Sequence, residues 1–193
     1  MKEILLQLMT ILNVGGYPVV AEFNPPSANA GTEVRQFLTE RYGWCPVELE
    51  ALYNWHNGQA FPVPVNDFHF LFDHALFLPF EQAKLYSEVA ASNDSAYNEY
   101  FVVFTSGGGE DYLMKMQGEE KGAIFYSSPS EFLGEPVKAF DSFEKLFLSV
   151  IVCYEAGVYW SQNGQFRIDI RKQMKKMAEL NPGCPRWVYD DPI

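Results

Sequence analysis

The chain has 193 residues, with 14 Lys or Arg against 25 Asp or Glu, which gives a formal net charge of −11 at pH 7. This length suits one domain, and a composition of 48% hydrophobic and 16% aromatic residues provides enough apolar surface to exclude a disordered chain. We expect no membrane and no nucleic-acid partner. No apolar run approaches the roughly 18 residues that span a bilayer, and an acidic chain repels anionic surfaces.

Helical periodicity dominates the first third of the chain. Apolar side chains recur at helical spacing over residues 2–12, 32–42 and 46–56. The Asn-Pro-Pro-Ser segment at 24–27 predicts a turn, because a residue that precedes proline is restricted to extended backbone. The second and third helices are expected to form a hairpin that ends at Gly58, since glycine accepts a positive φ.

A short aromatic segment and a fourth helix follow. Residues 68–72, Phe-His-Phe-Leu-Phe, predict a buried strand or an extended packing segment. Residues 79–89 predict a helix with a proline near its start. Its expected apolar contacts come from Phe80, Ala83, Leu85 and Val89.

The period then changes from helical to β-type. The runs 100–104, 112–116 and 123–126 are short, apolar and separated by glycine-containing turns. They predict an antiparallel meander, and a fourth strand is expected at 137–140.

A further helix is predicted over residues 143–154. The preceding segment 141–144, Asp-Ser-Phe-Glu, has an N-cap residue with Glu three positions later, and Gly157 ends the helix. We expect this helix to lie across one face of the sheet. The side chains expected to be buried against the sheet are Phe147, Val150 and Ile151.

The end of the chain differs in charge from the rest. Residues 1–156 hold 21 acidic and 8 basic residues, whereas residues 157–193 hold 4 acidic and 6 basic residues. Apolar and basic side chains interleave over residues 165–180, which predicts a basic amphipathic helix. We expect one domain over residues 1–156, with the basic helix and tail of residues 157–193 packed on it.

No pattern in the sequence points to catalysis. The triple glycine 107–109 lacks the Lys-Ser/Thr of a phosphate-binding loop, and the acids that follow it, Glu110 and Asp111, would repel phosphate. A hairpin turn is the better interpretation. No recognisable nucleophile motif occurs. We therefore expect no enzymatic activity, no catalytic residue and no cofactor.

A metal site is not expected either. The side chains that could ligate a metal are His56, His69, His74, Asp67 and Asp73. Among them, Asp67 and His69 have a spacing that places two ligands on one face of a strand, which is too few for a site. The cysteines Cys45, Cys153 and Cys184 form no CxxC or CxxH spacing, which argues against zinc and disulfides. With no secretion signal at the N-terminus, a reducing, cytoplasmic location is expected.

Five segments share the order and spacing of a known family. They are Phe23–Ser27, Tyr42–Pro46, Leu49–Gln59, Asp111–Leu113 and Asp141–Leu148. In this order they resemble SUKH-domain proteins, a group that includes fungal cell-wall assembly regulators of the Smi/Knr kind. The resemblance covers residues 23–156, and the triple glycine and the basic helix after residue 157 depart from it. The Trp-His-Asn-Gly segment at 55–58 is expected to pack and cap rather than to bind.

The resemblance implies an α+β domain with N-terminal helices, a central antiparallel sheet with helices packed on it and a closing amphipathic helix. It also implies a non-catalytic, protein-binding role. Bacterial SUKH proteins mostly act as immunity proteins that neutralise a polymorphic toxin, for instance a nuclease, by occluding its active surface. The alternative is a regulatory or scaffolding interaction protein of the Smi/Knr type. A small-molecule enzyme or ligand-binding protein is a third hypothesis.

The charge imbalance suggests where a partner would dock. An acidic face would steer a toxin domain that has a basic surface. We expect Glu110, Asp111, Glu119 and Glu120 to form the rim of this contact, because two neighbouring turns can present all four carboxylates to solvent. The same acids could equally be solvated turn residues with no partner.

Overall fold

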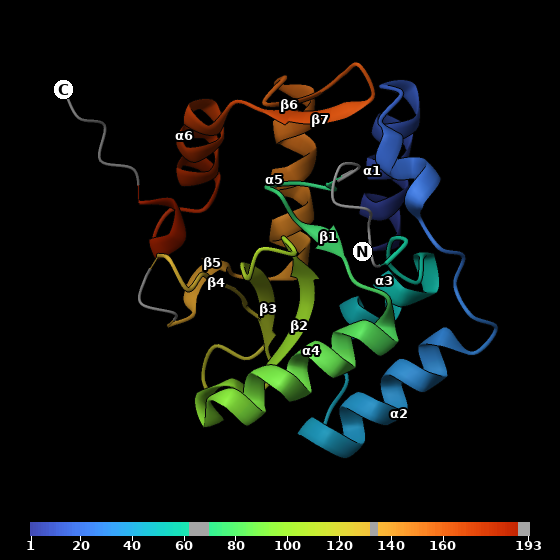
Figure 1. The fold of residues 1–193 in the computed structure, drawn as a ribbon, viewed down its shortest axis with the longest axis vertical. Coiled ribbons are helices and arrows are strands. Elements are labelled where there is room, and N and C mark those ends of the chain that lie inside the picture. The colour runs from blue at the N-terminus through green and yellow to red at the C-terminus, as the bar shows by residue number, and fades with distance from the viewer. Residues whose placement is uncertain (62–69, 132–134, 189–193) are drawn as a thin grey trace.

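A five-stranded antiparallel sheet forms the centre of a mixed α+β fold (Figure 1). The computed structural model describes residues 1–61, 70–131 and 135–188. The strands lie side by side in chain order, β1-β2-β3-β4-β5. Their bounds are β1 Leu76–Phe77, β2 Tyr100–Thr105, β3 Asp111–Lys115, β4 Ile124–Ser127 and β5 Val137–Phe140.

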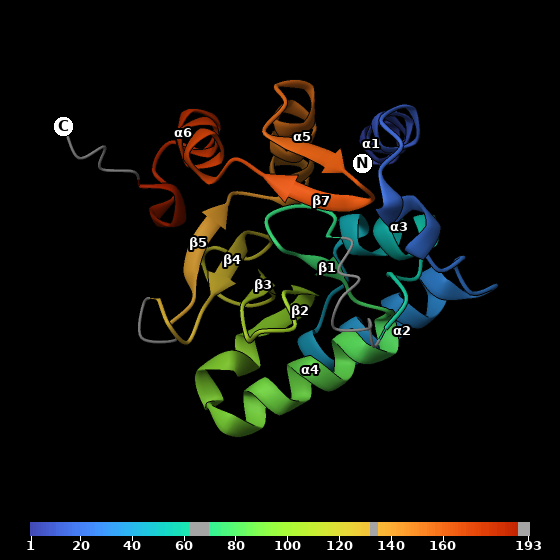
Figure 2. The same cartoon turned by 45° about the horizontal axis from the view of Figure 1, so that its top comes forward.

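Helices cover both sides of this sheet. The α-helices are α1 Lys2–Val14, α2 Ala30–Tyr42, α3 Val47–Trp55, α4 Phe80–Asn93, α5 Phe143–Glu155 and α6 Ile170–Leu180. Short 3-10 helices are η1 Pro18–Glu22, η2 Ser95–Glu99 and η4 Pro185–Trp187. In two views of the fold, α5 and α1 lie side by side on one side of the sheet, and α4 lies on the other (Figures 1 and 2). The α+β class expected from the sequence is confirmed.

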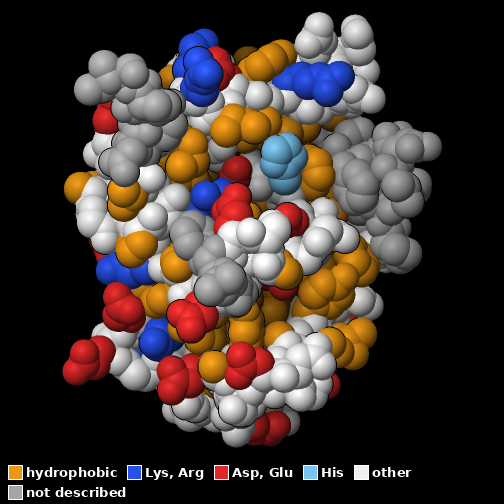
Figure 3. Space-filling model, turned by 60° about the vertical axis from the view of Figure 1, so that its left-hand side comes forward, with side chains coloured by type: hydrophobic (Ala, Val, Ile, Leu, Met, Phe, Trp, Pro, Cys, Tyr) orange, Lys and Arg blue, Asp and Glu red, His pale blue; other side chains and the backbone are white. Residues whose placement is uncertain are grey.

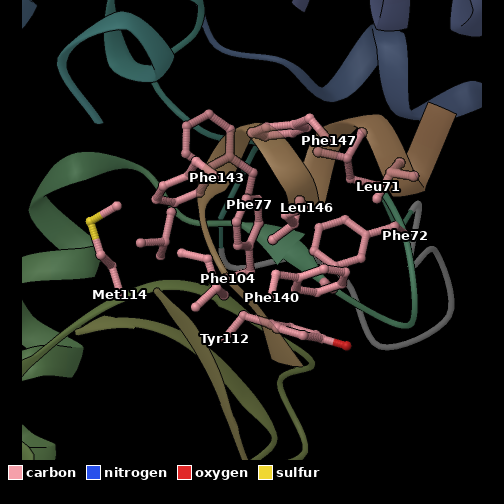
Figure 4. Close-up of a cluster of buried hydrophobic side chains, with 14 of the residues drawn as sticks. Leu71, Phe72, Phe77, Phe104, Tyr112, Met114, Phe140, Phe143, Leu146 and Phe147 are labelled. Carbon is pink, nitrogen blue, oxygen red and sulfur yellow. The ribbon is translucent and has the colours of Figure 1, made fainter. Parts of the chain in front are cut away.

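Helix α5 supplies much of the core between itself and the sheet. It begins at a cap in which Ser142 Oγ accepts a hydrogen bond from the Lys145 backbone N–H at 3.1 Å. Phe147 is fully buried, and its ring centroid lies 6.3 Å from that of Phe104 on β2. Figure 4 shows the aromatic side chains of α5 facing those of the strands. All three side chains expected to be buried on this helix are buried.

The predicted helices and strands up to residue 155 form where the periodicity placed them. The helical hairpin is α2 against α3, and an ion pair joins its two arms, with Arg35 Nη2 2.6 Å from Glu50 Oε2. The predicted meander is β2, β3 and β4, and the fourth strand is β5. The aromatic segment 68–72 lies partly outside the described residues. Its described part, residues 70–72, is not a strand. Leu71 and Phe72 are buried, which agrees with the predicted extended packing segment rather than with the predicted strand.

Helix α4 faces the sheet differently from the prediction. Phe80 and Ala83 are buried as expected, but Leu85 and Val89 are each 50% exposed. Ser87 occupies the inward position instead, where its Oγ accepts a hydrogen bond from a backbone N–H of β2 at 2.9 Å. The apolar contacts expected from Leu85 and Val89 are therefore wrong, because the side of α4 toward β2 lies along a different stripe of the helix.

A β-hairpin precedes the basic helix. The prediction extended that helix over residues 165–180, whereas β6 Tyr159–Gln162 pairs with β7 Gln165–Ile168 and α6 begins at Ile170. The connecting residues Asn163 and Gly164 have φ of 53° and 72°. Positive φ at both positions of a two-residue loop is the signature of the tight hairpin turn that Asn-Gly favours. The start of the predicted helix is therefore wrong.

The C-terminal segment lies against α5 and β5. Asn181 Nδ2 donates a hydrogen bond to Ser149 Oγ of α5 at 3.1 Å. Trp187 is buried and donates from Nε1 to the Ala139 carbonyl of β5 at 2.7 Å. Helix α6 contacts α5, and η4 contacts β5.

Candidate functional site

The four acids expected to form one rim lie at two ends of strand β3. Glu110 precedes the strand and Asp111 begins it, whereas Glu119 and Glu120 lie in the turn after it ends. The two turns are therefore not neighbours, because successive turns of an antiparallel meander lie at opposite ends of the strands. Glu119 and Glu120 are exposed, and Glu120 Oε1 lies 3.4 Å from Lys138 Nζ.

Asp111 differs from the other three acids because it is a strand residue. It pairs with Thr105 of β2 and Ser127 of β4. Its Oδ1 atom is buried and has no hydrogen-bond partner among the described residues. Burial raises the pKa of this carboxyl to about 6, although a hydrogen bond from the Thr105 side chain lowers the pKa in part. The sequence pattern, which placed Asp111 in a turn, did not indicate this burial.

Asp111 lies at a groove between the sheet and the helices that cover it. We call this the α4–η2 groove, and its volume is about 380 Å³. Its principal lining residues are Tyr86, Val89, Asp94, Tyr97 and Asp111. Two of these are acidic, and the described lining contains no Lys or Arg. The groove therefore combines aromatic walls with negative charge.

Local hydrogen bonds hold the walls of the groove in place. Asp94 caps η2, where its side chain accepts a hydrogen bond from the Ala96 backbone N–H at 2.9 Å. The Tyr97 hydroxyl lies 2.6 Å from Ser127 Oγ of β4. On the α4 side, burial raises the pKa of Tyr86, and the nearby Asp111 carboxylate raises it further.

Exposed apolar side chains adjoin the groove on α4. Val89 lines the groove, and Leu85 lies one turn earlier on the same stripe; each is 50% exposed. In the space-filling view, hydrophobic side chains reach the surface beside acidic ones in the lower half of the face shown (Figure 3). Exposed apolar side chains rimmed by charge are typical of protein-interaction surfaces.

Sequence reasoning did not identify most of this groove. Tyr86 and Tyr97 showed no motif, and the stretch 90–99 was assigned no structure. The available signal was Asn93-Asp94-Ser95, a run of cap and turn residues at the end of a helix. It indicated a turn but not that η2 would place an aromatic wall opposite Asp111.

The segment at the end of α3 is a structural joint. Asn57 Oδ1 accepts a hydrogen bond from the Phe80 backbone N–H at 2.9 Å, which satisfies a free donor at the start of α4. The backbone N–H of Asn57 also bonds to the Asn24 carbonyl at 3.0 Å. Gly58 has φ of 71°, and a Cβ there would lie 2.2 Å from the Pro79 nitrogen. These contacts agree with the packing and capping role expected for residues 55–58.

A second hollow, of about 300 Å³, lies where the C-terminal segment meets the sheet. We call it the Arg186 hollow, and its lining includes Asp73, His74, Tyr126, Glu131 and Arg186. Figure 3 shows acidic and basic side chains meeting beside a histidine in the middle of this face.

Arg186 connects the C-terminal segment to the sheet in this hollow. Its Nη2 lies 3.8 Å from Asp73 Oδ2 and its Nη1 lies 3.6 Å from Glu131 Oε2. The guanidinium carbon is 4.1 Å from the Tyr126 ring centroid, and the Tyr112 hydroxyl donates to Asp73. Arg186 pairs with Asp73 and Glu131, so this arrangement anchors the C-terminal segment to the sheet.

The side chains considered as metal ligands are only partly described. Asp67 and His69 lie outside the described residues. Asp73 accepts from Tyr112 and faces Arg186, while His56 Nδ1 lies 3.2 Å from the Asn24 carbonyl. Within the described ranges, no group of three or more His, Cys, Asp or Glu side chains is placed to hold a metal ion.

The fold defines an α+β domain with helices on both sides of an antiparallel sheet, the class that the SUKH resemblance implied. The SMI1 / KNR4 family (SUKH-1) model matches residues 38–149, more than half of the chain, and the chain belongs to this family. Its members are known generally as immunity proteins or Smi/Knr-like proteins and are generally non-catalytic. No curated protein matches the chain. Over the described ranges, no helix has the length and apolar character needed to cross a membrane.

The family match includes the whole α4–η2 groove and leaves out both ends of the chain. Helices α1 and α6 and the anchor at Arg186 lie outside residues 38–149. The groove is therefore part of the family domain, whereas the Arg186 hollow combines the domain with the C-terminal segment.

Proposed function

We propose that the chain is a non-catalytic immunity protein that neutralises a cognate toxin by binding over its active surface. Membership of the SUKH-1 family supports a protein partner such as a toxin. In this proposal the partner is a toxin domain with a basic surface, for instance a nuclease, and the encounter takes place in the cytoplasm.

The observation that carries the proposal is the composition of the α4–η2 groove. It joins exposed apolar side chains of α4 to two carboxylates, with no basic side chain in its described lining. Apolar and aromatic side chains at the centre of an interface supply most of the affinity, and charges at the rim select the partner. A basic protein surface complements such a site.

The four expected rim acids then have different roles. Asp111 lines the groove and is the acid that contacts the partner in this proposal. Glu110, next to it in the chain, lines the Arg186 hollow instead, where its carboxylate accepts a hydrogen bond from Ser106 Oγ. Glu119 and Glu120, at the other end of β3, act through the field of the whole acidic body, whose net charge is −11. Long-range charge of this kind changes the association rate more than the lifetime of a complex.

Co-expression tests the proposed function. Cells would produce toxin domains encoded beside this chain, with and without the chain, and survival and co-purification would be measured. We expect the chain to restore growth against one toxin and to co-purify with it. Failure to protect against or bind any of them would contradict the immunity role and favour the Smi/Knr-type scaffold.

A further inference from the structure

We propose that the α4–η2 groove is the receptor for a single arginine side chain of the protein partner, with its guanidinium paired to Asp111. This inference rests on the proposed protein-binding function and assigns the chemistry of the contact.

The first step is the unsatisfied carboxylate. Asp111 Oδ1 is buried and has no hydrogen-bond partner among the described residues, while the Thr105 side chain bonds to the same carboxyl group. Buried polar atoms are nearly always hydrogen-bonded, and an unpaired buried charge destabilises a fold. Asp111 lines the groove, so a donor from the partner that enters the groove could satisfy this buried acceptor.

The second step is the sign of the charge. Asp94 and Asp111 both line the groove, and Glu110 adjoins Asp111 in the chain. Asp94 is exposed and accepts the Ala96 backbone N–H, whereas Asp111 Oδ1 is buried and accepts no hydrogen bond from the described residues. With no Lys or Arg in the described lining, nothing within the groove neutralises these acids. A cationic donor complements them.

The third step distinguishes arginine from lysine. The groove walls are the side chains of Tyr86 and Tyr97 together with Val89. A guanidinium is planar and weakly hydrated, stacks on aromatic rings and donates several hydrogen bonds in a fixed fork. An ammonium is more strongly hydrated and gains less from flat apolar walls. The groove therefore fits arginine better.

The test uses small probes in place of the partner. N-acetyl-arginine amide and N-acetyl-citrulline amide have nearly the same shape, but citrulline carries no charge. Each would be titrated into the isotopically labelled full chain at pH 7.5 and fixed ionic strength, and amide chemical shifts would be recorded. We expect arginine amide to shift the backbone amide signals of Gly109 and Ser127 at the groove. We also expect it to bind at least about tenfold more tightly than citrulline amide, in line with a charge-assisted pair.

Two variants and a control define the outcome. Asp111→Asn removes the charge, and Val89→Arg places a competing guanidinium at the groove mouth; both should abolish the preference for arginine amide. Glu119→Gln, at the opposite end of β3, should leave it unchanged. Equal binding of the two probes, equal binding to Asp111→Asn, or shifts outside the groove would overturn the inference.

The arginine-receptor inference and the proposed immunity function can fail independently of each other. If arginine amide binds the groove but no toxin is neutralised, the immunity role fails and the receptor stands. If the chain protects cells and Asp111→Asn protects equally well with an unchanged dissociation rate, the arginine receptor fails and the immunity role stands.

Discussion

At the scale of single residues, Asp111 is held at a cost to stability. Its pKa of about 6 lies above the ordinary value of 3.8, because burial disfavours the charged form. The folded chain therefore binds more protons than the unfolded chain between these two pH values, so stability falls as pH rises through this window. A residue that destabilises the free protein at neutral pH is a candidate for function rather than packing.

Replacing Asp111 with Asn should stabilise the protein at pH 8 and have little effect near pH 4. The gain in unfolding free energy at pH 8 is up to about 3 kcal/mol, which follows from the pKa difference of roughly two pH units. Urea unfolding at both pH values measures it. An equal effect at the two pH values would show that the carboxyl is not held in the environment described.

Gly58 is a second position where one residue determines local structure. Its φ of 71° disfavours any side chain, and a Cβ would lie 2.2 Å and 2.4 Å from backbone atoms of Pro79 and Leu78. The link between β1 and α4 would have to move to admit a methyl group.

Gly58→Ala should therefore lower the unfolding free energy by more than about 2 kcal/mol. Gly164→Ala is the matched control, because its φ is 72° but a Cβ there would meet no atom of the described residues within 4 Å. Only the conformational cost of about 1–2 kcal/mol applies to it. If the two variants lose the same stability, the close approach at Gly58 has no energetic effect.

At the scale of elements, α5 holds the sheet through its buried aromatic side chains. Phe147 is fully buried and Leu148, the next residue, is 40% exposed. The ring of Phe147 lies near that of Phe104 of β2, and removing a ring from a closely packed core leaves a cavity that the neighbouring side chains fill only in part.

Phe147→Ala should destabilise the fold by about 3–5 kcal/mol, as a large-to-small change in a packed core. Leu148→Ala on the exposed side should cost less than about 1 kcal/mol. Thermal or urea unfolding of both variants measures the difference. A cost below about 1 kcal/mol for Phe147→Ala would contradict the packing of α5 on the sheet.

The elements also show what the sequence can predict and what it cannot. Strands β2 to β4 were predictable because they are short, buried apolar runs between glycine-containing turns. Helix α5 was predictable because burial of one face imposes a helical period on the sequence. The β6–β7 hairpin was missed, since the Asn163-Gly164 turn signal was overlooked beside the strong helical period of α6. The α4–η2 groove could not be predicted, because Tyr97 and Asp111 meet only through the meander and η2.

At the scale of the whole molecule, charge and apolar surface act over different ranges. The net charge of −11 attracts a basic partner from beyond contact, although salt screens it over about 8–10 Å. The apolar side chains of α4 and the Asp111 carboxylate act only at contact. The field should therefore set how fast a complex forms, and the groove should set how long it lasts.

The most direct test is the association rate with the toxin that the chain neutralises, measured at low and physiological salt. The test compares the wild type with a variant in which Glu110, Glu119 and Glu120 are Gln and Asp111 is Asn. We predict that the variant stays folded, binds about tenfold more slowly at low salt and shows a flatter salt dependence. Equal association rates and equal salt slopes for the two proteins would contradict the claim that acidic charge guides the partner to this domain.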